Sequence, residues 1–278
     1  MGTRTILKTY TGTPTIEGAG VNLTRIFSQP DVEELDPFLL LDFFDSSDPQ
    51  DYSAGFPMHP HRGIETITYL INGRIAHEDS IGNKGIIAPH GCQWMTAGRS
   101  ILHQEMPDIS VPILGTQLWL NLPKAHKMTA PAYREITEAD VPVYDTSDLL
   151  VRVLAGTFRE CKGPVKGTFV DPLYFDVTIR PGGTFSVDVP ADDTVFIFLL
   201  NGEIEFRGQG HIAAPCTRGA LLSKGDHVSI HSVNGARLLF IAARPLKEPI
   251  AWGGPIVMNT QEELRTAFQQ LRAGTFII

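Results

Sequence analysis

The chain lacks the features of membrane, nucleic-acid-binding and disulfide-stabilised proteins. No apolar run approaches the roughly twenty residues of a membrane-spanning helix, and the N-terminus is polar and charged where a secretion signal would be apolar. The net charge is −8 and no run of Lys and Arg exceeds two residues, which argues against binding to a phosphate backbone. The three cysteines, Cys92, Cys161 and Cys216, are widely spaced and form no Cys-x-x-Cys pair. We therefore expect a cytoplasmic protein with reduced thiols and with no membrane or direct nucleic-acid partner.

Glycine and proline, by contrast, are frequent, with 26 and 20 residues in a chain of 278. They separate short apolar or alternating segments that recur roughly every eight to twelve residues. The clearest of these segments are Val21–Phe27, Phe38–Phe44, Thr66–Ile71, Arg74–Asp79, Gln93–Thr96 and Gly115–Leu122. Their spacing is typical of an antiparallel β-sandwich or barrel. The pattern weakens from Pro123 to Asp148, so we expect a first β-barrel over 1–125, a linker over 126–148 and a second β-barrel over 149–278.

The two halves resemble copies of one fold. Glu65–Ile75 and Thr194–Ile204 both consist of an apolar strand, an Asn-Gly pair and a second strand. An Asn-Gly pair favours the two positive φ values of a type I′ hairpin turn. We therefore predict hairpin turns at Asn72-Gly73 and Asn201-Gly202.

The end of the chain follows a different pattern. Thr260 and Glu263 have the spacing of a capping box, and Gly274 is a typical helix stop. The apolar residues between them fall at helical spacing: Leu264, Ala267, Phe268 and Leu271. This pattern predicts one amphipathic C-terminal helix that packs on a barrel and holds no cofactor.

Three histidines and one glutamate form two alternating pairs, His59-Pro60-His61 and His103-Gln104-Glu105. With nine histidines in the chain, one such pair arises by chance at a rate of roughly a few tenths. Alternate residues of a strand share a face, so two neighbouring strands carrying these pairs would direct four ligands at one point. We therefore predict a metal site formed by His59, His61, His103 and Glu105.

This ligand set has a definite chemistry. Three neutral imidazoles and one carboxylate around a divalent ion leave a net charge of about +1 and, in octahedral geometry, two open positions. Such a set suits Fe, Mn, Ni, Cu or Zn, and affinity alone does not choose iron. A bound ion would lower the pKa of a coordinated hydroxyl. We expect Glu105 to be catalytic, acting both as a ligand and as a base toward an acidic hydroxyl.

The second half offers no equivalent ligand set. The repeat places Asp188 and Pro190 where His59 and His61 stand in the first half. We therefore expect the second barrel to hold no metal. His227 and His231 are close enough in sequence to share a strand face, and a weak second site there is the less favoured interpretation. The favoured one is that both are partly exposed polar residues.

Several longer segments closely resemble the pirin family of the cupin superfamily. They are Phe56–Gly63, Asp79–Gly85, Gln93–Gly98, Ile101–Pro107 and Gly254–Thr260. The resemblance covers essentially the whole chain. It implies two stacked antiparallel cupin β-barrels and one mononuclear Fe2+ in the first barrel, held by residues that match His59, His61, His103 and Glu105. It also implies a second barrel poor in metal.

Three further residues stand at informative positions of this resemblance. Glu65 occupies a place where some cupins have a carboxylate ligand; the matching Glu of pirins is not a ligand, so we expect Glu65 to support the site or to lie on the strand surface. His90 and Cys92 lie where pirins commonly have a Pro-Gly-Asp turn and an aliphatic residue. We favour a solvated turn residue for His90 over an extra polar group near the pocket, and a small core residue for Cys92.

The resemblance implies two competing functions. Some pirins oxidise the flavonol quercetin, opening its heterocyclic ring with dioxygen and releasing carbon monoxide. We therefore expect an iron-dependent dioxygenase whose partners are a flavonol and O2. Other pirins are described as regulators that bind a transcription factor or a metabolic enzyme, with the oxidation state of the iron as the switch, so a protein partner is the alternative. A cupin isomerase acting on a sugar is less favoured because the motifs match pirin.

Overall fold

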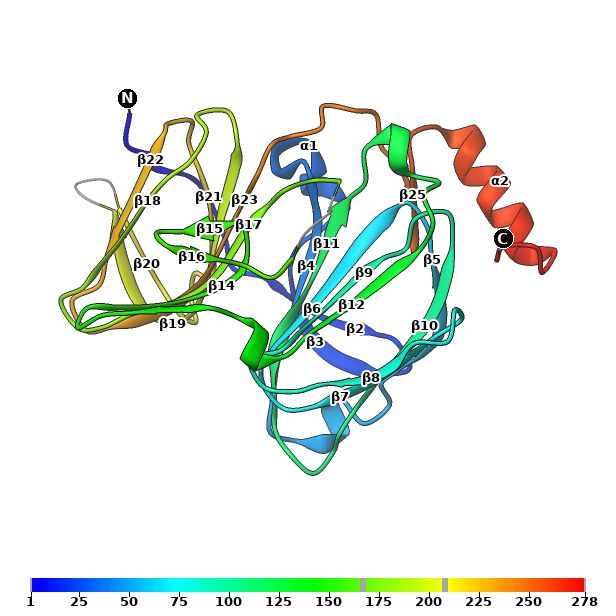
Figure 1. The fold of residues 1–278 in the computed structure, drawn as a ribbon, viewed down its shortest axis with the longest axis horizontal. Helices are drawn as coiled ribbons and strands as arrows, with labels where there is room; N and C mark the ends of the chain where they lie inside the picture. The colour runs from blue at the N-terminus through cyan, green and yellow to red at the C-terminus, as the bar shows by residue number, and fades with distance from the viewer. Residues whose placement is uncertain (1, 166–168, 207–209, 278) are drawn as a thin grey trace. The chain divides into compact units, whose positions relative to one another are not determined.

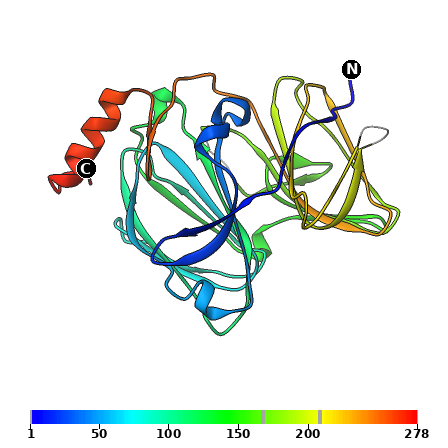
Figure 2. The same cartoon turned by 180° about the vertical axis from the view of Figure 1, so that it is seen from behind.

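The computed structural model describes residues 2–165, 169–206 and 210–277 of the chain, and it divides into two compact units (Figures 1 and 2). The N-terminal unit comprises Thr13–Val32, Phe38–Glu138 and Leu246–Ile278. The C-terminal unit comprises Met1–Gly12, Glu33–Pro37 and Ala139–Pro245. Both are built from antiparallel strands, which confirms the predicted all-β class.

The N-terminal unit consists of two antiparallel sheets and two short paired strands. Its strands are β2 (Thr13–Glu17), β3 (Val21–Phe27), β4 (Phe38–Ser46), β5 (Phe56–His61), β6 (Ile64–Asn72), β7 (Ile75–Asp79), β8 (Lys84–Ile87), β9 (Cys92–Thr96), β10 (Ile101–Pro107), β11 (Ile113–Asn121), β12 (Ala132–Ile136), β24 (Ala251–Gly253) and β25 (Ile256–Met258). Single 3-10 turns lie at Gln29–Asp31, Pro49–Asp51, Lys124–His126 and Glu138–Asp140. A seven-stranded sheet has the order β12-β9-β6-β11-β4-β3-β2, and a four-stranded sheet has the order β5-β10-β7-β8. Apolar residues from both sheets, such as Leu70 on β6 and Ile75 on β7, share one buried cluster, so the sheets pack face to face.

The C-terminal unit repeats this type of architecture. Its elements are β1 (Ile6–Tyr10), α1 (Val32–Leu35), β13 (Val143–Asp145), β14 (Leu149–Ala155), β15 (Thr157–Phe158), β16 (Cys161–Lys162), β17 (Leu173–Ile179), β18 (Thr184–Asp188), β19 (Thr194–Phe206), β20 (His211–Ala213), β21 (Gly219–Leu222), β22 (His227–His231) and β23 (Ala236–Ala243). The main path is β1-β21-β19-β23-β17-β14-β13, and the long β19 also pairs with β20 and β22. The interior is aromatic, with Phe158 stacked on Phe185 at 5.5 Å and Phe175 stacked on Phe240 at 5.7 Å between ring centroids.

The division between the units differs from the expected boundaries at 125 and 148. Strand β1 pairs with β21 of the C-terminal unit, although it comes first in the sequence. Conversely β24, β25 and helix α2 (Gln261–Arg272) belong to the N-terminal unit, where α2 lies beside β24 and β25 (Figure 1). The compact units therefore group Met1–Gly12 with the second half of the sequence and Leu246–Ile278 with the first half, which differs from the expected range 149–278 for the second barrel.

Specific hydrogen bonds attach the C-terminal segment to the N-terminal unit. The buried Arg62 guanidinium donates to the Gln270 side chain at 2.7 Å and to the Phe276 carbonyl at 3.0 Å. The buried Lys127 ammonium donates to the carbonyl oxygens of Val257 at 2.9 Å and Gly63 at 2.7 Å. Charged donors in a buried setting require such acceptors, so these bonds fix the segment against the strand that carries His61.

The C-terminal helix has the predicted ends. Thr260 accepts from the Glu263 backbone N–H, the Glu263 carboxylate accepts from the Thr260 backbone N–H, and Gly274 follows at φ +70°. The predicted capping box and stop are confirmed. Within the described ranges, no helix is both long and apolar enough to cross a membrane.

The predicted Asn-Gly hairpins were wrong. Strands β6 and β7 flank Asn72-Gly73 but belong to different sheets, and β19 runs without interruption through Asn201-Gly202. Only the glycines have positive φ, +96° and +81°. A type I′ turn requires positive φ at both of its central residues. Instead, Gly73 lets the chain pass from one sheet to the other, and β19 carries a register shift between Leu199 and Asn201.

Candidate metal centre

The two ligand-bearing segments predicted from the sequence are neighbouring strands. Strand β5 carries His59 and His61, and β10 carries His103 and Glu105. The strands are antiparallel, and His103 stands directly opposite His59. Directly opposite residues share a face, so the three imidazoles project from one side of the four-stranded sheet. The alternation argument from the sequence is therefore confirmed for the histidines.

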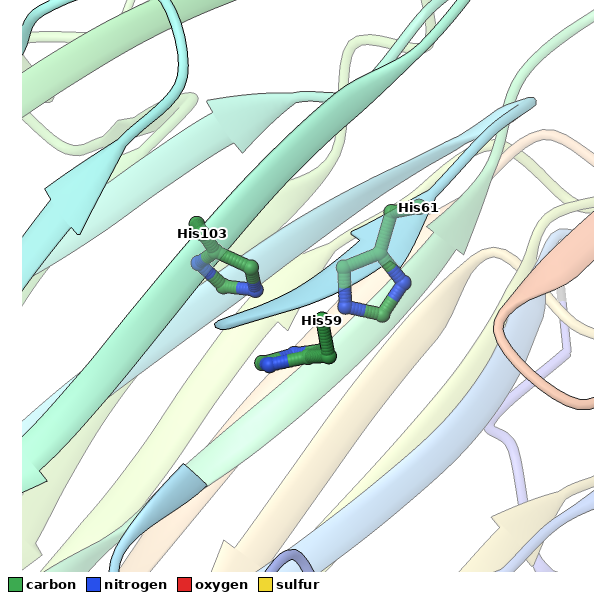
Figure 3. Close-up of side chains that lie close together, drawn as sticks. All are labelled: His59, His61 and His103. Atoms are coloured by element: carbon green, nitrogen blue, oxygen red, sulfur yellow. The ribbon is translucent and has the colours of Figure 1, made fainter. Parts of the chain in front are cut away.

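The three rings converge on one point (Figure 3). Their centroids are 4.9 Å apart for His59 and His61, 4.3 Å for His59 and His103, and 5.1 Å for His61 and His103. One ring nitrogen from each residue lies within 4.8 Å of the other two. A single ion can be reached from all three at that separation, since metal–imidazole bonds are about 2.0–2.1 Å long.

The hydrogen bonds of the rings leave other ring nitrogens available. His59 Nδ1 lies 2.9 Å from the Pro57 carbonyl oxygen, and His61 Nδ1 lies 3.2 Å from the Pro255 carbonyl oxygen. Donation to a carbonyl places the proton on Nδ1 and the lone pair on Nε2. Among the described residues, His61 Nε2 and both nitrogens of His103 are buried without a hydrogen-bond partner. Buried polar atoms without partners are rare, and a metal ion would satisfy His61 Nε2 and one of the two His103 nitrogens.

Burial also keeps the imidazoles in the form that binds metal. Desolvation, with a smaller contribution from His59, lowers the pKa of His61 to about 3. The same cause holds the pKa of His103 well below its usual value, with smaller contributions from His61, His59 and His77. Both rings are therefore neutral near pH 7, and only a neutral imidazole offers a lone pair to a metal.

Glu105 lies beside the histidine cluster and is held by the opposite sheet. Its Oε2 is 4.0 Å from His103 Nε2. Thr68 Oγ1 donates to Glu105 Oε1 at 2.8 Å, and Gln117 Nε2 donates to Glu105 Oε2 at 2.8 Å. The register of β5 and β10 shifts between His103 and Glu105, so Glu105 stands opposite Phe56. The structure thus places Glu105 next to His103, whereas the set of donor atoms that all lie within 4.8 Å of one another comprises His59, His61 and His103 without Glu105.

A cavity of about 600 Å³ opens onto His59 and His61. Its lining includes His59 and His61 and the aromatic side chains of Phe56, Trp119 and Trp252. Trp119 contacts His61 edge-on, at 5.0 Å between ring centroids, and packs against Trp252 at 5.9 Å. A pocket of this size with apolar walls and a few polar groups is typical of small-molecule sites.

Charged residues form another part of the cavity lining. Arg25 donates to both oxygens of Asp42, at 2.8 and 2.7 Å, and to Glu17 at 2.7 Å. These groups line the same cavity as His59 and His61. One cation between two carboxylates leaves an excess of negative charge there, which disfavours anionic substituents in that region.

Several residues that shape the site were not identified from the sequence. Thr68 and Gln117 hold Glu105, while Pro255 and Trp252 come from the C-terminal segment. A usable signal existed for Gln117, because alternation places this polar side chain on the same strand face as Trp119. No sequence signal indicated Pro255, because the contact depends on where the end of the chain packs.

Glu65 is buried away from the ligands. It accepts hydrogen bonds from Trp94 Nε1 at 3.1 Å and from Thr96 Oγ1 at 2.5 Å. Thr68, three residues later on β6, points toward Glu105, so Glu65 projects from the opposite face of the strand. It is neither a support of the metal site nor a strand-surface residue, and both expected roles were wrong.

The structure places His90 in a turn, as expected, but its side chain is only partly exposed and its Nδ1 is buried; Cys92 is the expected core residue. His90 lies in a turn with φ +60°, where its backbone N–H donates to the Leu70 carbonyl at 2.7 Å. Cys92 is buried in β9, and desolvation raises the pKa of its thiol. A thiol of that kind is an unreactive core group.

The histidine pair of the C-terminal unit has local polar partners. His227 Nδ1 lies 2.7 Å from Asp188 Oδ1, and His231 Nδ1 lies 3.2 Å from Thr184 Oγ1. Both histidines are partly exposed on β22. Partly exposed polar residues were the favoured interpretation of this pair from the sequence.

Comparisons with known proteins agree with this architecture. The pirin family model matches residues 20–120, and the pirin C-terminal cupin domain matches residues 174–277. A protein of Pseudomonas aeruginosa named "Putative quercetin 2,3-dioxygenase" is 41% identical over 281 residues, which cover 99% of each chain. A pirin-like protein of Caulobacter vibrioides is 42% identical over 279 residues, covering 99% of this chain and 100% of its own. The crystal structure of quercetin 2,3-dioxygenase from Acinetobacter baumannii has a TM-score of 0.88 and 31% identity, covering 99% of both chains. The matches span both units, and the chain therefore belongs to the pirin family.

Proposed function

We propose that this chain is an iron-dependent dioxygenase that opens a flavonol such as quercetin with O2. The observation that carries the proposal is the group of three convergent imidazoles, two of them buried with unpartnered nitrogens, at an aromatic-lined cavity. The names of the relatives that resemble the whole chain support this choice of reaction. The cavity walls suit a flat, largely apolar ligand.

In this proposal His59, His61 and His103 hold the metal and Glu105 completes the ligand set. The backbone carbonyls of Pro57 and Pro255 fix two of the rings in the correct tautomer. The bound ion would supply a Lewis acid that lowers the pKa of a coordinated hydroxyl. Iron is proposed because of the pirin resemblance, since the donor set alone accommodates several divalent metals.

Glu105 is also the proposed base. Its carboxylate lies beside His103, where it could accept the proton of an incoming flavonol hydroxyl at one Oε atom. The aromatic rings of Trp119, Trp252 and Phe56 would hold the flavonol and exclude water around the reacting ring. The substrate would then react as the electron-rich flavonolate, and O2 would open its heterocyclic ring with release of carbon monoxide.

The test is aerobic turnover of quercetin by protein reconstituted with Fe2+, followed by oxygen uptake and loss of flavonol absorbance alongside metal analysis. Protein loaded with Zn2+ is the control, because zinc has no redox chemistry. Turnover that requires iron and is lost in Glu105→Ala supports the proposal. Stoichiometric iron without turnover contradicts it and favours an iron-containing regulator that binds another protein.

A further inference from the structure

Both carboxylate oxygens of Glu105 are hydrogen-bonded by the sheet that faces β10. Thr68 Oγ1 and Gln117 Nε2 each donate over 2.8 Å, one to Oε1 and the other to Oε2. Glu105 is only 2% exposed, so water does not replace these donors readily. A buried carboxylate with one fixed donor on each oxygen has little rotational freedom.

The register of the seven-stranded sheet produces this arrangement. Gln117 on β11 stands directly opposite Thr68 on β6, so the two side chains share a face. Gln117 Nε2 also lies 3.1 Å from Thr68 Oγ1. The two donors therefore form one unit, which we call the carboxylate clamp.

The orientation of the Gln117 amide is determined by its neighbours. Trp119 Nε1 donates to Gln117 Oε1 at 3.1 Å. An indole N–H can only donate and a carboxylate can only accept, so the amide oxygen must face Trp119 and the amide nitrogen must face Glu105. Trp119 in turn contacts His61 and lines the cavity. The clamp is thus connected by hydrogen bonds to the cavity wall.

We propose that Thr68 and Gln117 are positioning residues that fix the Glu105 carboxylate and set its strength as a metal ligand, with Trp119 holding the Gln117 amide. The inference rests on the proposed role of Glu105 as a ligand. Partners that orient a ligating carboxylate typically contribute about 10- to 100-fold in metal affinity. Without its two donors, the carboxylate would rotate and meet the ion less often in a binding geometry.

The test is Co2+ titration of the metal-free full-length protein, with the visible absorption of the bound cobalt as the second readout. Thr68→Val and Gln117→Met remove one donor each with little change of shape. We expect about 10- to 100-fold weaker Co2+ binding and an altered cobalt spectrum in both. Thr68→Ser keeps the hydroxyl and should restore the affinity and spectrum of the parent protein.

Thr66→Val is a matched control on the same strand face. Thr66 is 1% exposed, and its Oγ1 has no hydrogen-bond partner among the described residues. The substitution is chemically identical to Thr68→Val but removes no bond to Glu105, so Co2+ affinity should be unchanged. Thermal unfolding of each metal-free variant shows whether it is folded, and Trp119→Phe offers a milder change that should weaken binding less than Gln117→Met.

A double-mutant cycle separates the clamp from the ligand role of Glu105. If the clamp acts through Glu105, adding Gln117→Met to Glu105→Ala has no further effect on Co2+ affinity. Two outcomes would contradict the proposed clamp. In the first, Glu105→Ala weakens Co2+ binding but Thr68→Val and Gln117→Met do not. In the second, Thr68→Ser binds Co2+ as weakly as Thr68→Val. If Glu105→Ala itself leaves Co2+ affinity unchanged, the proposed ligand role fails instead.

Discussion

The two units share an antiparallel architecture but fill their interiors with opposite chemistry. The N-terminal unit directs His61, His103 and Glu105 inward, and each is buried. The C-terminal unit instead packs phenylalanines, including Phe185 and Phe240, into one continuous apolar cluster. The comparison indicates that one unit carries the chemistry while the other is built for packing.

The difference has an energetic meaning. Burying imidazoles and a carboxylate costs free energy unless partners or a metal satisfy them, whereas burying an aromatic side chain stabilises the fold. His103 has no hydrogen-bond partner in the described structure, and such groups are normally rare in an interior. Functional sites are where this rule is broken, since the same groups that weaken the apo fold bind the ligand.

The largest expected effect comes from removing a ligand from the N-terminal unit. His61→Ala and Glu105→Ala should each lower iron content and flavonol turnover together, by 100-fold or more in turnover, on the order of what a lost catalytic group costs. Metal analysis of the purified variants, paired with turnover per protein, measures both. Unchanged iron stoichiometry in both variants would exclude them as ligands.

The next effect concerns the packing of the C-terminal unit. Phe240→Ala removes a ring that stacks on Phe175 and meets Phe185 at 5.4 Å, so it should cost about 3–5 kcal/mol of unfolding free energy. Co2+ affinity of the folded variant should stay at the parent value. Urea unfolding followed by far-UV circular dichroism measures the cost. Loss of Co2+ binding in the folded variant would contradict a purely structural role for this unit.

The comparison also shows which features could be predicted from the sequence. The strands β5 and β10 were predictable because alternation is a local property: His59 and His61 must share a face wherever the strand lies. The order of the sheets explains why Gln117 and Thr68 were missed. The contact of Gln117 and Thr68 with Glu105 depends on the register between strands and on the face-to-face packing of two sheets. Neither feature can be inferred from a short sequence segment.

The packing of each terminal segment with the other half of the sequence could not be predicted, for a related reason. The amphipathic pattern of the C-terminal helix predicted its existence and its capping box, but any apolar surface could have received it. In the structure its apolar side chains pack with those of β24 and β25, and Gln270 accepts from Arg62. For the same reason the contact between His61 and the Pro255 carbonyl could not be foreseen.

A third prediction compares buried carboxylates. Asp176 in the C-terminal unit is fully buried and receives two bonds from Arg237, at 2.9 and 2.5 Å. Asp176→Asn removes the charge and leaves the guanidinium without its partner. Breaking such a pair costs on the order of 3 kcal/mol. Urea unfolding of the variant at pH 7 provides the measurement, and a change under about 0.5 kcal/mol, the range of ordinary surface substitutions, would show that the pair is dispensable.

Glu65 in the N-terminal unit should behave in the opposite way, because its hydrogen bonds come from the neutral donors Trp94 and Thr96. Desolvation raises the pKa of Glu65, and the two hydrogen bonds and the charge of Arg134 offset this only in part. The folded state then keeps the proton to a higher pH than the unfolded chain, whose Glu pKa is about 4.3. The stability that Glu65 contributes is therefore present below about pH 4.3 and is lost as pH rises toward its folded pKa, by up to about 1.4 kcal/mol per pH unit.

Glu65→Gln removes this loss while keeping both bonds, because the amide oxygen can accept from Trp94 and the amide nitrogen can donate to the Thr96 hydroxyl. The variant should gain stability relative to the parent as pH rises from about 4.3 toward the folded pKa of Glu65, with no further gain above that pKa. Tryptophan fluorescence during urea unfolding reports this unit, since Trp94, Trp119 and Trp252 all belong to it. A stability difference that does not change with pH would mean that Glu65 is ionised in the folded state. The N-terminal unit would then tolerate a buried charge, and the contrast with Asp176 would disappear.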